Sequence, residues 1–321
     1  MMSVRKRAAA AALANLCLLA SASLAGLILE ARAEPARKAP PPPAPAVIGA
    51  RIEAAVDELK DDPRYKGLSD AQRRDNIEFV AGNMIFATIH EVGHMLIAEM
   101  GLPVLGREED AADSFAVLTG LKLKNGFSDR VLMQSARGWF LSDRRNQDQG
   151  IKNVFYDEHG LDRQRAYNIV CLMVGGDPEK FSALADLTKL PEERQGTCQG
   201  DYSNASWSWN KVLTPHIRKP NQPKTKITVT YSDPGPYALF ERGIRRVQFL
   251  ELLADHLSDR FVWRKPVSFE VQACGSPGAR WDLQSLKIVV CYELAVDFAD
   301  LYRSYGLDQK LPSPSSATGK P

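Results

Sequence analysis

The feature that most constrains this 321-residue chain is a pair of histidines four residues apart in its most apolar helical segment. Apolar residues recur at helical intervals over residues 75–100, and His90-Glu91-Val92-Gly93-His94 lies within that stretch. Because residues i and i+4 share one face of an α-helix, both imidazoles can reach a single ion. Glu91 is turned by about 100° from His90, which places its carboxylate beside that ion rather than on it. The motif therefore predicts a metal site with a general base next to it.

The residues around the motif also favour a bound metal. Three ionisable groups stand on about one helical turn between the apolar runs at residues 86–89 and 95–97. Burying them without a partner would cost several kcal/mol, and a divalent cation supplies that partner. The alternative is two packed histidines with a surface glutamate. We expect Zn²⁺ on His90, His94 and a third protein ligand, with the fourth position open to water.

The third ligand is expected from the acidic first turn of the next predicted helix, which contains Glu108, Glu109 and, further on, Asp113. Glu109 stands four residues before Asp113, and this spacing resembles the E-x-x-x-D helix of gluzincin metallopeptidases. In that pattern the glutamate is a ligand and the aspartate holds a histidine N–H. The metzincin class is excluded, because Ile97 and Met100 stand where it needs glycine and histidine.

The path between the two helices decides which acid reaches the metal. A tight hairpin centred near Pro103 would bring Asp113 level with the histidines, whereas an extended loop at residues 102–106 would let Glu109 reach them. We expect Glu109 as the third ligand. Asp113, and after it Glu108, stay open as alternatives.

Both ends of the chain are predicted to lie outside the folded domain. Arg5-Lys6-Arg7, an apolar run at residues 8–29 and Ala31-Arg32-Ala33 are typical of an export signal with its cleavage site. The alternative is an uncleaved membrane anchor through residues 8–29. The predicted segments are a signal peptide at residues 1–33, a Pro-rich linker at 34–46, the domain at 47–310 and a disordered tail at 311–321. The domain is therefore predicted to be periplasmic or secreted.

Charge and composition narrow the class of partner. Forty-one basic and thirty-nine acidic residues leave a net charge of +2, which does not indicate a nucleic-acid-binding surface. With 44% hydrophobic residues, the chain has the composition of a globular protein. We expect a peptide or protein substrate, no nucleic acid, and membrane contact only through an uncleaved N-terminal segment.

Four cysteines remain once the predicted signal peptide, which contains Cys17, is removed. In an oxidising compartment we expect the local disulfides Cys171–Cys198 and Cys274–Cys291, with buried free thiols as the alternative. A zinc site made of cysteines is disfavoured, because the sequence has no C-x-x-C spacing.

Periodicity predicts a mainly helical α+β chain with a small antiparallel sheet. The expected helices are residues 48–59, 75–100, a helix from 107, 130–141, 161–174, 178–187, 238–257 and 292–302. The expected strands are residues 226–231, 267–271 and 286–290, which alternate in polarity or are rich in β-branched residues. Residues 275–282 are expected to form a hairpin connection between the last two strands.

Several blocks of the chain resemble the DUF4344 metallopeptidase family. They are HEVGHMLIAEMGLPVLGREEDAADSFAVL within residues 83–118, Tyr156-Asp157-Glu158-His159-Gly160-Leu161-Asp162, Gln164-Arg165-Ala166-Tyr167-Asn168 and Cys291-Tyr292-Glu293-Leu294. The resemblance covers nearly the whole mature chain. It implies a zincin-like fold of the gluzincin type, with secreted or membrane-associated members, and zinc peptidase chemistry on a substrate that it does not specify.

These residues together predict hydrolysis of a peptide bond. Zinc on His90, His94 and Glu109 would activate a metal-bound water, and Glu91 would take its proton and deliver it to the leaving amine. An edge strand of the C-terminal sheet, or one formed before the histidine helix, would hold the substrate extended. One alternative is a non-catalytic envelope interaction protein, in which a fourth protein ligand would fill the open position on the zinc. The other is a peptide-binding module that does not cleave what it binds. Intact Glu91 argues against the peptide-binding module.

One more histidine lies in the polar run Asp157-Glu158-His159. We expect it to belong to a capped loop that leads into the predicted helix at residues 161–174. The alternative is that His159 donates a hydrogen bond to a substrate oxyanion. Trp207 and Trp209 are expected to pack rather than to bind carbohydrate.

Overall fold

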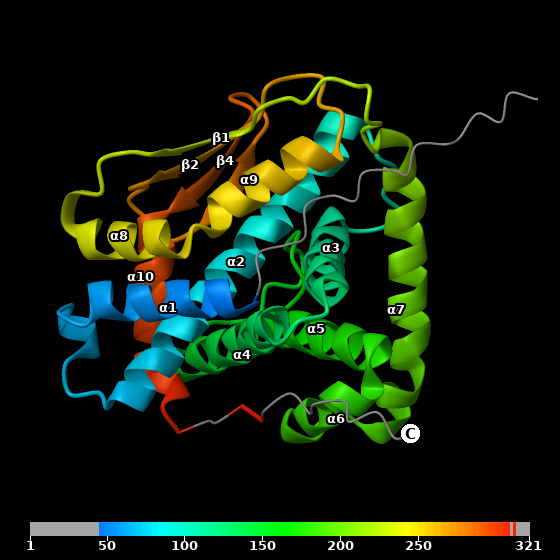
Figure 1. Ribbon diagram of the computed structural model, residues 1–321. Coiled ribbons are helices and arrows are strands. Elements are labelled where there is room, and N and C mark those ends of the chain that lie inside the picture. The colour runs from blue at the N-terminus through cyan, green and yellow to red at the C-terminus, as the bar shows by residue number, and fades with distance from the viewer. Residues whose placement is uncertain (1–44, 309–310, 313–321) are drawn as a thin grey trace, which may run out of the picture. The chain divides into compact units, whose positions relative to one another are not determined.

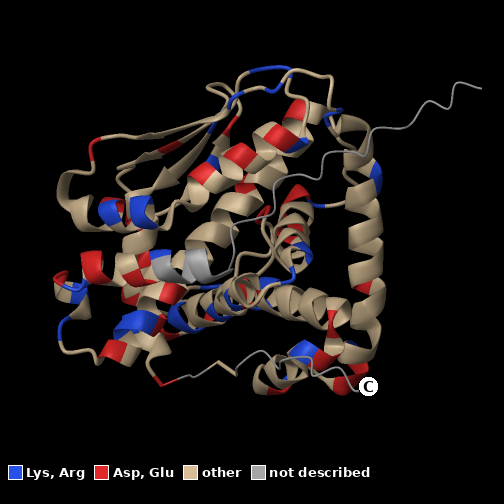
Figure 2. Ribbon diagram, in the orientation of Figure 1, with Lys and Arg blue, Asp and Glu red and all other residues tan. Residues whose placement is uncertain are grey.

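The computed structural model describes residues 45–308 and 311–312 (Figure 1). The signal peptide at residues 1–33 lies outside them, as do most of the linker at 34–46 and most of the tail at 311–321, so these assignments remain predictions. Within the described residues, no helix combines the length and the apolar character needed to cross a bilayer. Charged residues of both signs are interspersed along the described helices (Figure 2).

Most of the described chain is helical, and it has the α+β class that the sequence predicts. The helices are α1 (Pro45–Leu59), α2 (Asp70–Met100), α3 (Glu108–Leu123), α4 (Gly126–Asp148), α5 (Asp162–Gly176), α6 (Pro178–Leu187), α7 (Glu192–Leu213), α8 (Ala238–Val247), α9 (Phe249–Arg260) and α10 (Tyr292–Leu301), which continues into a π-helical turn at Tyr302–Gly306. The strands are β1 (Thr228–Tyr231), β2 (Ser268–Gln272), β3 (Ala279–Asp282) and β4 (Lys287–Cys291).

Helix α2 carries the histidine motif and runs through the middle of the fold (Figure 1). It begins at a capping box, in which the Ser69 hydroxyl accepts from Gln72 N and the Gln72 side chain accepts from Ser69 N. It ends at Gly101, whose left-handed φ of 63° suits glycine. Helices α1, α3, α4 and α10 pack against it, together with strands β3 and β4. The motif is therefore held by a helix that is buried on several sides.

Helix α7 is not predicted by periodicity. Among its residues only Cys198 and Trp209 are buried, so it lacks the apolar stripe that marks a helix in a sequence. Tertiary contacts hold it instead. The Cys171–Cys198 disulfide joins α7 to α5, and Trp209 Nε1 donates to the Ala111 carbonyl and the Ser114 hydroxyl on α3.

The other predicted helices are present. Helix α6 has the predicted bounds, 178–187, whereas most of the others begin or end at different residues from those predicted, because capping residues and not periodicity set the ends. Helix α4 extends the predicted segment 130–141 at both ends, and the Asn125 side chain caps its start by accepting from Ser128 N. The predicted helix over residues 238–257 is two helices, α8 and α9. Gln248 separates them because its backbone is left-handed, with a φ of 56°.

The sheet is mixed, so the expectation of an antiparallel sheet is wrong. Its strand order is β1-β2-β4-β3, in which β1/β2 and β2/β4 are parallel and only β3/β4 is antiparallel. The expected hairpin connection at residues 275–282 contains β3, which lies on the far side of β4 from β2. This strand is four residues long and mostly half-exposed, as edge strands are, so it gives little signal in the sequence.

Both expected disulfides are present, and the second one fits the parallel pairing of β2 and β4. Because Gln272 pairs with Cys291, the carboxyl ends of these strands meet at one sheet edge, and the Cα atoms of Cys274 and Cys291 are 5.5 Å apart. In an antiparallel hairpin the same cysteines would lie at opposite ends of the strand pair. Five residues of strand, roughly 17 Å, would separate them, which is too far for a disulfide.

Close packing of α5 on α7 leads to a first prediction. A Cβ on Gly175 would lie 2.1 Å from the Cys198 carbonyl oxygen, a backbone atom that cannot rotate away. We expect Gly175→Ala to lower the free energy of unfolding by about 1–3 kcal/mol or more, as overpacking does, in urea denaturation of the oxidised protein.

The matched control is Gly200→Ala on α7. No described atom lies within 4 Å of the Cβ position there, and alanine favours the helix, so stability should stay level or rise by up to about 1 kcal/mol. Equal effects of the two variants would contradict the contact between the helices.

Candidate metal centre

Helix α3 lies close enough to α2 to bring an acid onto the two histidines of the motif. Gly93 is at the contact, where a Cβ would lie only 3.0 Å from Ala112 Cα. The Nε2 atoms of His90 and His94 are 3.1 Å apart. The Glu109 carboxylate lies beside both, with Oε2 3.0 Å from His90 Nε2 and Oε1 3.4 Å from His94 Nε2. Of the three acids weighed from the sequence, Glu109 is the one beside both Nε2 atoms.

The other two acids contact the opposite nitrogens of the same rings. Asp113 Oδ1 is 2.8 Å from His90 Nδ1, and Glu108 Oε1 is 2.8 Å from His94 Nδ1. An ionised carboxylate can only accept, so each Nδ1–H donates and the neutral imidazole then has its lone pair on Nε2. When both rings are neutral, as metal binding requires, two lone pairs and the Glu109 carboxylate converge on one point. A donor set of this kind, with neutral imidazole and carboxylate ligands, fits a divalent cation such as Zn²⁺.

The charges of the cluster shift the pKa values of its members strongly. Burial alone would lower the pKa of His94, but hydrogen bonds to Glu109 and Glu108 raise it to about 9. His90 follows the same pattern, because Asp113 and Glu109 outweigh its burial and raise its pKa. Burial would raise the pKa of Glu109, yet the three imidazoles around it, the third being His159, hold that pKa far below its usual range. The carboxylate is thus ionised and available as a ligand.

Glu91 differs from these acids. Burial raises its pKa above the ordinary glutamate value, although the nearby histidines and a backbone N–H partly oppose the shift. A carboxyl with a raised pKa is suited to take up and release a proton near neutral pH.

His159 joins the cluster from the loop before α5. Its Nε2 is 2.9 Å from Glu109 Oε2, and its ring stacks on that of His90 with centroids 6.5 Å apart. The expected loop contact is also present, because Asp157 Oδ1 accepts from His159 N at 2.9 Å. Ligand atoms of His90, Glu109 and His159 lie within 4.8 Å of one another. The side chain of His159 is 46% exposed, whereas that of His90 is 6% exposed.

Arg165 on α5 has no role assigned from the sequence, yet it completes the support of His90. Its Nε and Nη2 donate to the two oxygens of Asp113 at 2.8 and 2.7 Å. Its guanidinium also lies 3.7 Å from the ring centre of Trp139 on α4. The sequence contains Arg165 in one of the blocks that resemble DUF4344, but a lone arginine on a helix does not indicate what it contacts.

Strand β3 meets the motif through its backbone. The N–H of Trp281 donates to Glu91 Oε2 at 2.7 Å. Cys291 N donates to the Gly278 carbonyl, so by the alternation of an antiparallel ladder Ala279 and Trp281 direct their own N–H and C=O groups to the open edge of the sheet. This edge therefore runs past Glu91. Residue types could not have shown the contact, because a backbone amide carries no side-chain signal.

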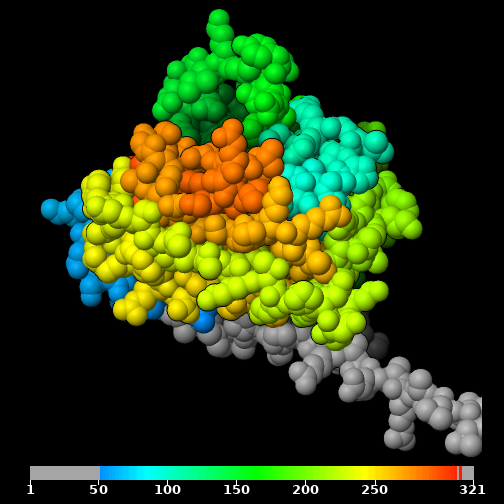
Figure 3. All heavy atoms as spheres, turned by 90° about the horizontal axis from the view of Figure 1, so that it is seen from above, coloured from blue at the N-terminus to red at the C-terminus, as the bar shows by residue number. Residues whose placement is uncertain are grey.

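A cavity of about 190 Å³ adjoins these groups. Glu91, His90 and His159 lie on its wall, and other residues of α2, α4, α5, α10 and strand β3 contribute the rest. In Figure 3 a hollow is visible between the green part of the chain and the orange strands. The candidate site is thus open on the side where β3 passes.

Comparison with known protein families gives one match. Residues 51–213, about half of the chain, match the model of DUF4344, a family described as "Putative metallopeptidase", and the chain belongs to this family. The match spans most of α1 and all of α2 to α7 and does not extend to the sheet, so it is shorter than the resemblance expected from the sequence blocks. No curated protein and no solved structure matches the chain. The family supports a metal ion and, coarsely, peptide hydrolysis.

The buried pair of Arg165 and Asp113 leads to a second prediction. Replacing Arg165 by methionine leaves the Asp113 carboxylate buried with His90 as its remaining partner. We expect Arg165→Met to lower the free energy of unfolding by about 3–5 kcal/mol, measured by urea denaturation in the presence of EDTA.

Arg163→Met, two residues earlier on the same helix, is its control. Arg163 pairs with Asp143 but is 54% exposed, so its loss should cost no more than about 1 kcal/mol. If both variants lost the same stability, Arg165 would not be supporting a buried charge.

Proposed function

We propose that this protein is an exported zinc-dependent metallopeptidase, in which His90, His94 and Glu109 hold Zn²⁺ and Glu91 is the general base. The observation that carries the proposal is the convergence of two imidazole Nε2 atoms and one ionised carboxylate beside a second carboxyl with a raised pKa. Membership of a metallopeptidase family agrees with it. The substrate is a peptide or protein.

Each residue of the cluster has a distinct part in the proposed reaction. A bound Zn²⁺ would act as a Lewis acid that acidifies water and polarises a carbonyl group. Glu91 takes the proton of the attacking water and delivers it to the leaving amine. Asp113 and Glu108 fix the tautomers and orientations of the two histidines through Nδ1, and Arg165 fixes Asp113.

The edge of β3 is the proposed place for the peptide backbone. An extended peptide pairs with an open sheet edge by main-chain hydrogen bonds. Next to Glu91, Ala279 offers its N–H and C=O groups and Trp281 its C=O, while the Trp281 N–H is bonded to Glu91. Of the two edge strands weighed from the sequence, one from the C-terminal sheet and one before the histidine helix, the contact with Glu91 favours the former.

Export is supported by the two disulfides, since disulfides persist in oxidising compartments. With the predicted signal peptide, they favour a periplasmic or secreted protein, or one anchored through residues 8–29. Neither the net charge nor the candidate site favours a nucleic-acid partner.

A second function is favoured by one observation, the position of His159. As a fourth protein ligand, His159 would fill the coordination position that catalysis leaves to water. The site would then be structural, as in a zinc-stabilised interaction protein. We favour catalysis, because His159 is nearly half exposed on a loop while Glu91 lies beside the centre. In the catalytic case His159 donates to the substrate oxyanion.

The role of Glu91 is tested by Glu91→Gln. Wild type and variant should each bind about one zinc per chain, and the variant should lose about 10²–10⁴-fold in turnover, because an amide cannot take the proton. Elemental analysis and digestion of a broad peptide library measure the two quantities.

Glu99→Gln, on the same helix but with no contact to the cluster among the described residues, should keep full turnover. Equal turnover of wild type and Glu91→Gln would remove the base assignment. A wild type free of metal would remove the site.

The two functions are separated by His159→Ala. If the site is catalytic, the variant keeps about one zinc per chain and its turnover falls by about 100-fold or more, as when an oxyanion donor is lost. His94→Ala should instead lose the zinc. Loss of zinc from both variants would support the structural site and count against the peptidase.

A further inference from the structure

We propose that the cavity beside Glu91 binds a bulky, uncharged apolar side chain of the substrate residue next to the cleaved bond. This inference rests on the proposed function and specifies its substrate class. The cavity measures about 190 Å³, which is room for one large side chain rather than a folded segment.

The walls of the cavity are mainly apolar. The polar residues on the wall are Asn83, His90, Glu91, Ser142, His159 and Arg165. The apolar surface comes chiefly from Phe86, Ala87, Trp139, Leu294 and Phe298. These residues come from α2, α4 and α10, three helices that pack on one another, so the cavity is built into the core of the fold and not on a loop. An apolar side chain that enters it leaves water, which is the main source of affinity in such a site.

The polar groups on the wall are already engaged. Arg165 is bound by both oxygens of Asp113, and the Asn83 Nδ2 group donates to the carbonyls of Phe79 and Gln134. The wall histidines His90 and His159 are also paired with carboxylates, those of Glu109, Asp113 and Asp157. Each described cation on the wall therefore already has an acidic partner. The acidic residue on the wall is Glu91. A substrate lysine paired with it would occupy the carboxylate that is proposed to accept the proton of the attacking water. Charged side chains are disfavoured on both counts.

A peptide paired with the edge of β3 would lie beside this cavity. Ala279 lines the cavity, and its backbone groups face the open edge of the sheet. Successive side chains of an extended peptide alternate in direction, so a peptide paired with β3 directs one side chain inward beside Glu91. The small side chain of Ala279 leaves that entrance open.

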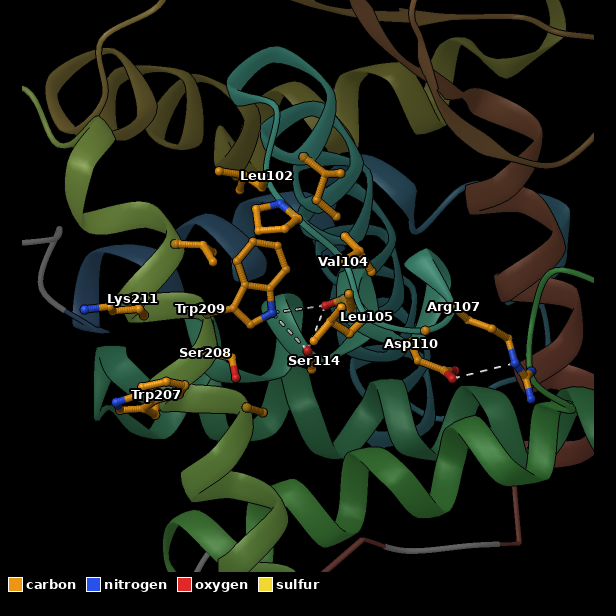
Figure 4. Close-up of a pocket in the computed structure, with 16 residues that line it drawn as sticks. Leu102, Val104, Leu105, Arg107, Asp110, Ser114, Trp207, Ser208, Trp209 and Lys211 are labelled. Carbon is orange, nitrogen blue, oxygen red and sulfur yellow. Dashed lines mark hydrogen bonds and ion pairs between the residues drawn. The ribbon is translucent and has the colours of Figure 1, made fainter.

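A second cavity, of about 520 Å³, is larger but has no such relation to the site. It lies between α7 and residues 102–107, where Trp209 faces Leu102 and Val104 (Figure 4). Trp207 and Lys211 point outward from α7, and Trp207 is 68% exposed, so the expectation that Trp207 packs is wrong. Its described lining includes neither the motif histidines nor Glu91 or Glu109. We use it as the control site.

The test narrows the cavity with Ala87→Leu. Ala87 lies one turn before Glu91 on the same face of α2, and it lines the cavity. Ala205→Leu makes the same substitution in the control cavity. Leu294→Ala widens the cavity beside Glu91 and serves as a second variant that overpacking cannot affect.

Two measurements are made on the full mature protein. The first is the affinity of the metal-free protein for acetyl-Gly-Xaa-Gly-amide peptides, with Leu, Phe, Asp or Lys as Xaa, by isothermal titration calorimetry. The second is the cleavage pattern of the zinc-loaded protein on a peptide library.

Wild type and Ala205→Leu should bind the Leu and Phe peptides at least about 10-fold more tightly than the Asp and Lys peptides. Ala87→Leu should lose about 10-fold or more of this affinity, and Leu294→Ala should shift the preference from Leu to Phe. Cleavage sites should carry a bulky apolar residue at one fixed position beside the cleaved bond.

The inference would be overturned by equal affinities for the four peptides. It would also be overturned if neither Ala87→Leu nor Leu294→Ala changed the affinity for the Leu and Phe peptides. Both results would count even if the protein cleaves peptides. The expected binding preference without any cleavage would keep the cavity assignment and reject the peptidase. The two failures are thus distinguishable.

Discussion

The close contact between α2 and α3 is the constraint on which the rest of the site depends. At Gly93 the two backbones approach so closely that a Cβ would press on Ala112. Because of this approach, the Glu109 carboxylate lies beside both imidazole Nε2 atoms while its neighbours on α3 contact the Nδ1 atoms. Turning α3 by one residue, about 100°, would exchange these acids. A single pair of helices thus supplies the candidate ligands and the groups that orient them.

The other residues of the candidate site come from segments more distant in the sequence, and they contact side chains of that helix pair. Arg165 on α5, stacked on Trp139, neutralises the buried Asp113. Strand β3 brings a backbone N–H to Glu91 from beyond the segment that matches the family model. The family segment therefore contains the candidate metal ligands, while the sheet that follows it provides the edge at which we propose that a substrate binds. This division explains how the candidate metal centre and the proposed binding surface are combined in a single α+β fold.

The fold was predictable where burial follows a local period. Helices with an apolar stripe, such as α2 and α6, are confirmed, since side chains three and four residues apart must face the same core. Helix α7 was missed because a disulfide and Trp209 hold it instead of a stripe. Strand β3 was missed because four half-exposed edge residues carry little pattern. The expectation of an antiparallel sheet was wrong, because a sequence pattern locates strands but does not show which strands are neighbours or in which direction they pair.

The sequence by itself determined the histidine pair, Glu91 between them and the three acids that could join them, since spacing within a helix is local geometry. It also favoured the two cysteine pairs, which close short segments and which the structure confirms. Tertiary structure alone decided that Glu109 lies beside both Nε2 atoms, that His159 and Arg165 enter the cluster, and that Trp281 reaches Glu91 across 190 residues. These contacts depend on how separate elements pack, and no local period in the chain encodes that packing.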